Sequence, residues 1–85
     1  MEIAFDPAKD ATNITKHGIS LVRATELELG AWYVDDRRDY GEVRYRAFGW
    51  IDGKPYVLAF TWSGVTLRAI SLRRARPKEM RKYGL

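Results

Sequence analysis

The fold of this chain is decided by residues 43–62, which read Val43-Arg44-Tyr45-Arg46-Ala47-Phe48-Gly49-Trp50-Ile51-Asp52-Gly53-Lys54-Pro55-Tyr56-Val57-Leu58-Ala59-Phe60-Thr61-Trp62. An Asp-Gly pair between two runs rich in β-branched and aromatic residues is the strongest short-range signal for a two-residue hairpin turn. A turn at Asp52-Gly53 pairs Tyr45 with Phe60. The neighbouring pairs are then Ala47 with Leu58 and Val43 with Trp62.

A second, weaker turn signal follows at Ser63-Gly64. A two-residue turn there pairs Trp62 with Val65. Phe60 then lies opposite Leu67, and Leu58 lies opposite Ala69. The two hairpins together predict three consecutive antiparallel strands.

This register assigns each side chain to one face of the sheet, because side chains alternate along a strand. One face is apolar and is expected to be the core: Val43, Tyr45, Ala47, Tyr56, Leu58, Phe60, Trp62, Val65, Leu67 and Ala69. The other face has a basic end, where Arg46, Ala59 and Arg68 form a row flanked by Arg44, Thr61 and Thr66. Its opposite end is an apolar patch of Phe48, Trp50, Val57, Ile70 and Leu72. We expect the C-terminal helix or a partner protein to cover that patch.

The N-terminal half contains helix signals. Residues 2–5 form a candidate strand, and Asp6-Pro7 predicts the start of a helix that runs to about His17, with Gly18 just past its end. Its apolar stripe is expected to lie on the sheet: Ala8, Ala11, Ile14 and Thr15. Ser20 is expected to cap a second helix over residues 21–29, followed by a strand over 31–34. The predicted fold is α+β, a single domain (1–85) with two N-terminal helices on one face of a twisted, mainly antiparallel sheet and a short C-terminal helix.

Charge is distributed unevenly along the chain. Residues 1–42 carry five basic and nine acidic side chains, a net charge of −4, and residues 43–85 carry ten basic and two acidic, a net charge of +8. This asymmetry indicates an anionic partner for the second half, and a nucleic acid is the commonest. The sequence has no cysteine, no apolar run long enough to cross a membrane and no signal-peptide pattern, so we expect a cytoplasmic protein without a membrane partner.

The basic C-terminal third could support RNA cleavage without a metal or another cofactor. That reaction needs a base for the ribose 2′-hydroxyl, an acid for the leaving oxygen, and cations for the charge that develops on the phosphate. The candidate cations are Arg44, Arg46, Arg68 and Arg73. Glu79 or His17 is the candidate base, and Tyr83 or an arginine the candidate acid. The candidate RNA contacts are Lys16, Arg74, Arg76, Lys78, Arg81 and Lys82.

Each of these residues also has an ordinary structural explanation. The arginines could point into water and pair with Asp35, Asp36 or Asp39. Glu79 and His17 suit the helix ends at which they stand, and Tyr83 could be a core aromatic. The alternative function is a non-catalytic module that binds RNA or another protein. A DNA-binding regulator fits less well, because no helix-turn-helix is evident.

Several segments, in order and at compatible spacing, resemble the BrnT-type toxins. These segments are Lys16-His17-Gly18-Ile19-Ser20, Asp36-Arg37, Tyr40-Gly41-Glu42-Val43-Arg44, Arg68 to Ala75, and Glu79 to Tyr83. The resemblance implies the toxin half of a type II toxin–antitoxin pair with a RelE-like fold. It also implies a ribonuclease that arrests translation. Its partner would be a BrnA-type antitoxin, which neutralises the toxin in a hetero-oligomer and itself binds operator DNA.

Overall fold

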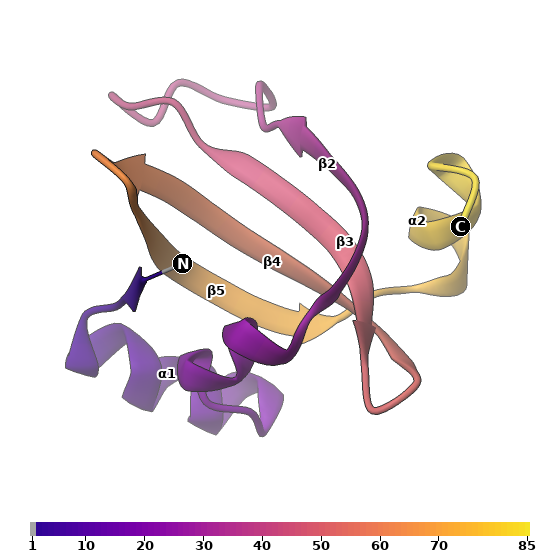
Figure 1. Cartoon of the computed structure of the whole chain (residues 1–85), viewed down its shortest axis with the longest axis horizontal. Helices are drawn as coiled ribbons and strands as arrows, with labels where there is room; N and C mark the ends of the chain where they lie inside the picture. The colour runs from indigo at the N-terminus through magenta and orange to yellow at the C-terminus, as the bar shows by residue number, and fades with distance from the viewer. Residues whose placement is uncertain (1) are drawn as a thin grey trace.

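A five-stranded mixed sheet organises the chain, in the order β1-β5-β4-β3-β2 (Figure 1). The structure is a computed structural model that describes residues 2–85. Its strands are β1 (Ile3–Ala4), β2 (Glu28–Val34), β3 (Tyr45–Ile51), β4 (Lys54–Ser63) and β5 (Thr66–Arg74), and its helices are α1 (Pro7–His17), the 3-10 helix η1 (Leu21–Glu26) and α2 (Pro77–Lys82). β1 pairs with β5 in parallel, and the other neighbours are antiparallel. The predicted α+β class is therefore confirmed.

The first hairpin has the predicted register. Tyr45 lies opposite Phe60, and the turn residues Asp52 and Gly53 have φ values of 52° and 74°. Two positive φ angles match the right-handed twist of the flanking strands. The predicted pair of Val43 with Trp62 does not form, because β3 begins at Tyr45 and Val43 is exposed.

The second hairpin has its turn one residue later than predicted, which shifts the pairing of β4 with β5 by two residues. Ser63 lies opposite Thr66, so the turn is formed by Gly64 and Val65 instead of Ser63 and Gly64. Gly64 adopts a φ of 61°, which places the turn where glycine can supply it. A shift of two preserves the face of each side chain near the turn. Val65, however, is 88% exposed and does not belong to the core.

A β-bulge at Ile70 changes the face of every later side chain in β5. Phe60 pairs with Ala69 but Ala59 pairs with Ser71, so Ile70 is the extra residue. We predicted that Leu72 belongs to the apolar patch on the face opposite the core. That prediction was wrong, since Leu72 lies opposite Leu58 and is completely buried in the core. The turn signal in the sequence fixes the register only beside the turn, so it could not predict an extra residue further along β5.

Helix α1 begins and ends as predicted but buries a different side. The Asp6 carboxylate accepts a hydrogen bond from the Ala8 amide, and Gly18 ends the helix with φ 70°. The predicted apolar stripe is exposed, and the buried residue of the helix is Asn13. Asn13 donates to and accepts from the backbone of Leu72 at 2.8 and 3.0 Å, and also donates to the Ile19 carbonyl. Its amide thus pairs with β5 as a neighbouring strand would, and α1 lies along that strand (Figure 1).

The predicted second helix is only the six-residue η1, so the expected pair of helices on the sheet is not formed. Ser20 caps η1 as expected, but the chain enters β2 at Glu28, with Gly30 as a bulge. β2 approaches β3 so closely that a Cβ on Gly49 would overlap the Glu28 carbonyl oxygen. Strand pairing with β3 therefore prevails over helical continuation.

The two faces of the sheet have different surroundings. The core face carries Ala47, Leu58, Phe60, Leu67, Ala69 and Leu72, packed with Ile19, Leu21 and Ala24. The open face carries Arg46, Phe48, Val57, Ala59, Thr61, Arg68, Ser71 and Arg73. Its apolar end is covered as expected by α2, whose Met80 packs with Phe48 and Val57, while Tyr83 and Leu85 complete the cluster. No helix among residues 2–85 is long and apolar enough to cross a membrane.

Candidate active site

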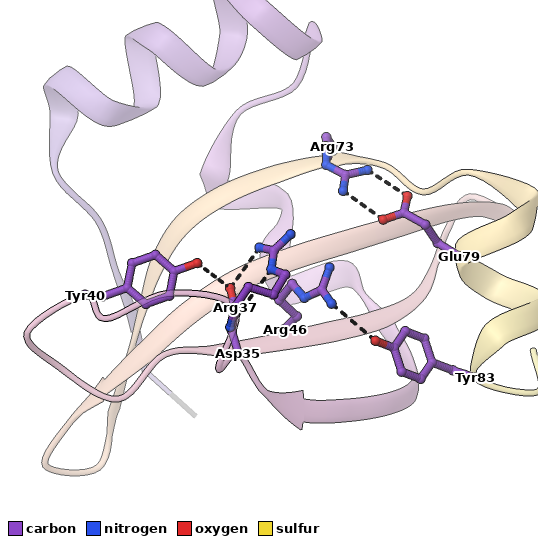
Figure 2. Close-up of polar contacts among 7 residues, drawn as sticks. All are labelled: Asp35, Arg37, Tyr40, Arg46, Arg73, Glu79 and Tyr83. Atoms are coloured by element: carbon purple, nitrogen blue, oxygen red, sulfur yellow. Dashed lines mark hydrogen bonds and ion pairs between the residues drawn. The ribbon is translucent and has the colours of Figure 1, made fainter.

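A cation and a hydroxyl meet where the open face adjoins α2. Arg46 Nη2 donates a 3.2 Å hydrogen bond to Tyr83 Oη (Figure 2). The Tyr83 ring packs against Tyr33 and Phe48, with ring centroids 4.4 and 4.6 Å apart, and the Arg46 guanidinium lies 5.2 Å from the Phe48 centroid. The aromatic contacts hold both polar groups in place, since stacked rings restrict the tyrosine.

A second arginine is fixed by an acid from the first turn of α2. Arg73 Nη1 and Nη2 donate to the two Glu79 oxygens at 2.9 Å each, and Glu79 also accepts from the Arg76 amide (Figure 2). The hydrogen bonds from Arg73, with a smaller effect from the Arg76 amide, lower the pKa of Glu79 to about 2. Glu79 is consequently a weak base and a rigid support for the guanidinium of Arg73.

A buried carboxylate organises the loop that follows β2. The Asp35 carboxylate accepts hydrogen bonds from Arg37 Nε and Nη2 at 2.8 and 2.9 Å and from Tyr40 Oη at 3.0 Å (Figure 2). The Arg37 guanidinium holds the pKa of Asp35 well below its usual range. The Arg44 guanidinium lies 4.4 Å from the Tyr40 ring centroid and pairs with Glu42. Asp35 therefore pairs with the loop's own Arg37, and neither it nor Asp36 or Asp39 forms an ion pair with Arg44, Arg46 or Arg68 within residues 2–85.

The predicted row of Arg46, Ala59 and Arg68 is not formed. Because of the corrected register, Ser71 completes the row that begins with Arg46 and Ala59, and Arg68 lies opposite Thr61, next to Ala4 of β1. Arg68 is still on the open face and is exposed. The bulge brings Arg73 onto that face, opposite Val57.

The remaining predicted residues fall into three places. Arg74 lies on the core-face side, with its guanidinium 5.7 Å from the Tyr56 ring centroid, so the structure does not bring it to the open face. The α2 side chains line a shallow hollow of about 650 Å³: Arg76, Lys78, Glu79, Arg81 and Lys82. Lys16 and His17 line a separate hollow of about 360 Å³ beside Ile70 and Ser71. No hydrogen bond within residues 2–85 links His17 to the arginines, Glu79 or Tyr83.

Two parts of the site were missed from the sequence. Tyr33 stacks on Tyr83, and Arg37 is held by Asp35 at the edge of the open face. The alternation in Trp32-Tyr33-Val34 was a signal that one of these aromatics would face the arginines. The pairing of Asp35 with Arg37 had no such signal, since every charge in that loop was a possible partner.

The fold and this face define a class: a small basic α+β domain with arginines and a tyrosine hydroxyl on one face of its sheet. The family model that matches residues 5–79 is described as the ribonuclease toxin, BrnT, of a type II toxin–antitoxin system. The match spans most of the chain, which therefore belongs to the BrnT toxin family. A comparison with curated proteins found no significant match.

Proposed function

We propose that RNA is bound and cleaved on the open face without a metal ion. The ribose 2′-hydroxyl gives its proton to solvent water and attacks the neighbouring phosphorus, and the bond from phosphorus to the 5′-oxygen breaks. The observation that carries this proposal is the hydrogen bond from Arg46 to Tyr83, which sets a cation beside a group that can donate a proton. Membership of a family of ribonuclease toxins supports RNA as the substrate.

Tyr83 acts as the general acid in this proposal. Its hydroxyl oxygen accepts from Arg46, so the hydroxyl proton remains available to the leaving 5′-oxygen of the RNA. Arg46 and Arg73 stabilise the negative charge that accumulates on the phosphate oxygens in the transition state. Both guanidinium groups are held before substrate binds, one by Tyr83 and Phe48 and the other by Glu79.

Glu79 positions Arg73 in this mechanism instead of acting as the base. A carboxylate with a pKa near 2 that already accepts two bonds from Arg73 has little affinity for the 2′-hydroxyl proton. His17 lies in the hollow beside α1 and binds RNA there together with Lys16. The basic α2 residues, with Arg44 and Arg68, contact phosphates on either side of the cleaved bond.

The cellular role follows from the same family. The chain cleaves RNA to inhibit translation in the cytoplasm and is neutralised in a hetero-oligomer by a BrnA-type antitoxin, through which the complex contacts operator DNA. The structure supports a role for the open face in RNA binding, because Arg46, Arg68 and Arg73 lie on that one side of the sheet.

The test compares Arg46→Ala with Arg74→Ala, which removes the same side chain from the opposite face. We expect wild type and Arg74→Ala to arrest bacterial growth and deplete RNA. Arg46→Ala should lose at least about 100-fold in cleavage rate on purified RNA in the presence of EDTA, and Arg68→Ala, a phosphate contact, should lose less.

Full activity of Arg46→Ala would show that the site is elsewhere. Cleavage abolished by EDTA would exclude the metal-independent mechanism. If the folded wild type binds RNA but neither cleaves it nor arrests growth, the chain is a non-catalytic binding module.

A further inference from the structure

The core face is only partly covered, and it leaves an apolar groove of about 460 Å³. Both N-terminal helices pack mainly against β5, and η1 has only six residues, so they cover the face incompletely (Figure 1). The groove is lined by Ile3, Ala24, Thr25, Leu27, Leu29, Trp32, Ala47, Leu58, Phe60, Trp62 and Leu67. All of these side chains except Thr25 are apolar.

A band of four aromatic rings runs from β2 to β4, and all of them except Tyr45 line the groove. Trp32 lies 5.5 Å from Tyr45, Tyr45 lies 5.4 Å from Phe60, and Phe60 lies 5.8 Å from Trp62, measured between ring centroids. The two tryptophans at the ends are 51% and 41% exposed, and Leu29 beside them is 60% exposed. A contiguous exposed patch of large apolar side chains marks an interaction surface, and tryptophan is enriched among the residues that dominate binding.

The chemistry of the groove lining restricts what can occupy it. None of the residues that line the groove is charged, and nearby acids are placed elsewhere: Glu28 lies opposite Trp50 of the other face, and Asp6 caps α1. Arg23 is itself paired with Glu26 and Asp52. A lining without a basic side chain offers nothing to bind phosphates, so the groove disfavours RNA and suits an apolar segment of a partner protein.

We propose that this groove anchors the antitoxin, through an amphipathic segment whose apolar side fills the groove. The inference deepens the proposed function, on which it rests for the presence of an antitoxin partner. Strand β2 separates the groove from the open face: Trp32 faces the groove, and the next residue, Tyr33, stacks on Tyr83. A partner anchored in the groove reaches the open face by passing around the edge of β2.

The groove and the open face then have separable roles, which Trp32→Glu tests with Val65→Glu as its control. Both variants place a carboxylate at an exposed apolar residue, but Val65 stands in the β4–β5 turn outside the groove. The probe is the purified BrnA-type antitoxin of the proposed function. We expect Trp32→Glu to raise the Kd by at least about 30-fold and Val65→Glu by less than about twofold. Expressed alone, both variants should arrest growth as wild type does, and coexpressed antitoxin should fail to rescue cells only with Trp32→Glu.

The outcomes separate this inference from the proposed function. If wild type alone is not toxic, the proposed function fails, and the Kd comparison still decides the docking site. If Trp32→Glu is toxic yet binds the antitoxin as wild type does, the docking site is wrong. Gel filtration showing a wild-type dimer that Trp32→Glu dissociates would make a second copy the occupant. Should Trp32→Glu fail to fold, Trp62→Glu on another strand provides the same comparison.

Discussion

Arg46 of β3 and Tyr83 just beyond α2 are 37 positions apart in the sequence and are joined by a 3.2 Å hydrogen bond from the guanidinium to the hydroxyl. This bond links the sheet to the C-terminal segment at the place where apolar and basic parts of the open face meet. The position of Tyr83 therefore depends on two things, the stacking of its ring and the cation beside its oxygen.

Tyr83→Phe removes the hydroxyl and keeps the stacked ring. We expect the RNA cleavage rate to fall by about 10²- to 10⁴-fold, the usual contribution of a general acid, while the thermal midpoint changes little because the ring contacts remain. Tyr33→Phe is the matched control: it removes the hydroxyl of the stacking partner and should cleave RNA normally. Equal activity of Tyr83→Phe and wild type would contradict the role of Tyr83 as acid.

The pair of Arg73 and Glu79 predicts a specific loss of stability in acid. Because the folded protein lowers the Glu79 pKa from 4.5 to about 2, the pair contributes fully above pH 4.5 and is lost as the pH falls from there to about 2. The contribution is on the order of 3 kcal/mol at most, since Arg73 remains partly exposed to screening solvent. In urea unfolding across this range, Glu79→Gln should show a weaker dependence on pH than wild type.

Glu28→Gln removes a carboxylate that makes no side-chain hydrogen bond within residues 2–85 and serves as the control. It should retain the wild-type acid dependence. A Glu79→Gln variant with the same acid dependence as wild type would show that this carboxylate is not strongly paired in solution.

Asn13→Leu tests the amide that pairs with β5. The substitution keeps a similar volume but leaves the Leu72 N–H and carbonyl and the Ile19 carbonyl without their partner. Each unsatisfied buried group costs about 1–3 kcal/mol, so we expect unfolding to become easier by at least about 3 kcal/mol and the thermal midpoint to fall by more than about 10 °C. Thr12→Leu, on the exposed side of the same helix, should change the midpoint by only a few degrees.

Gly49→Ala tests the close approach of β2 and β3. The added Cβ meets the Glu28 backbone, which cannot move without shifting β2, so we expect a loss of at least about 2 kcal/mol in chemical unfolding. The comparison is Gly30→Ala, where the added atom meets only side chains, Leu85 at 2.9 Å and Trp50 at 3.0 Å, and these can shift more readily than a strand backbone. A similar small loss in both variants would show that β2 yields easily.

The parts of the fold that could be predicted from the sequence are those with local causes. Asp6, Pro7 and Gly18 define α1, and Asp52-Gly53 sets the first register, because caps and turns act within a few residues. The bulge at Ile70 and the change from helix to strand within residues 27–30 depend on contacts with residues distant in the sequence. The Leu72 backbone is hydrogen-bonded by the Asn13 side chain. The close approach of β2 to β3 is possible because Gly49 has no side chain.

The candidate site shows the same division. Arg44, Arg46 and Arg68 were placed on the open face by simple alternation along their strands. Arg73 was named for its charge and its place in the basic C-terminal third. It reaches the open face only because of the bulge, and the same shift sends Arg74 to the opposite side. Its pairing with Glu79 determines the chemistry that Glu79 can perform, and no sequence pattern distinguishes that pairing from an ordinary helix-end charge.

The amide of Asn13 has a consequence for self-association. A sheet can grow into a filament only if both of its borders accept new strands. On the β5 border, the two-residue β1 and the Asn13 side chain already occupy backbone groups that an incoming strand would need. Pairing between the β2 borders of two molecules gives a dimer without a further free border. A toxin that accumulates without its antitoxin is therefore protected from polymerising through its strands.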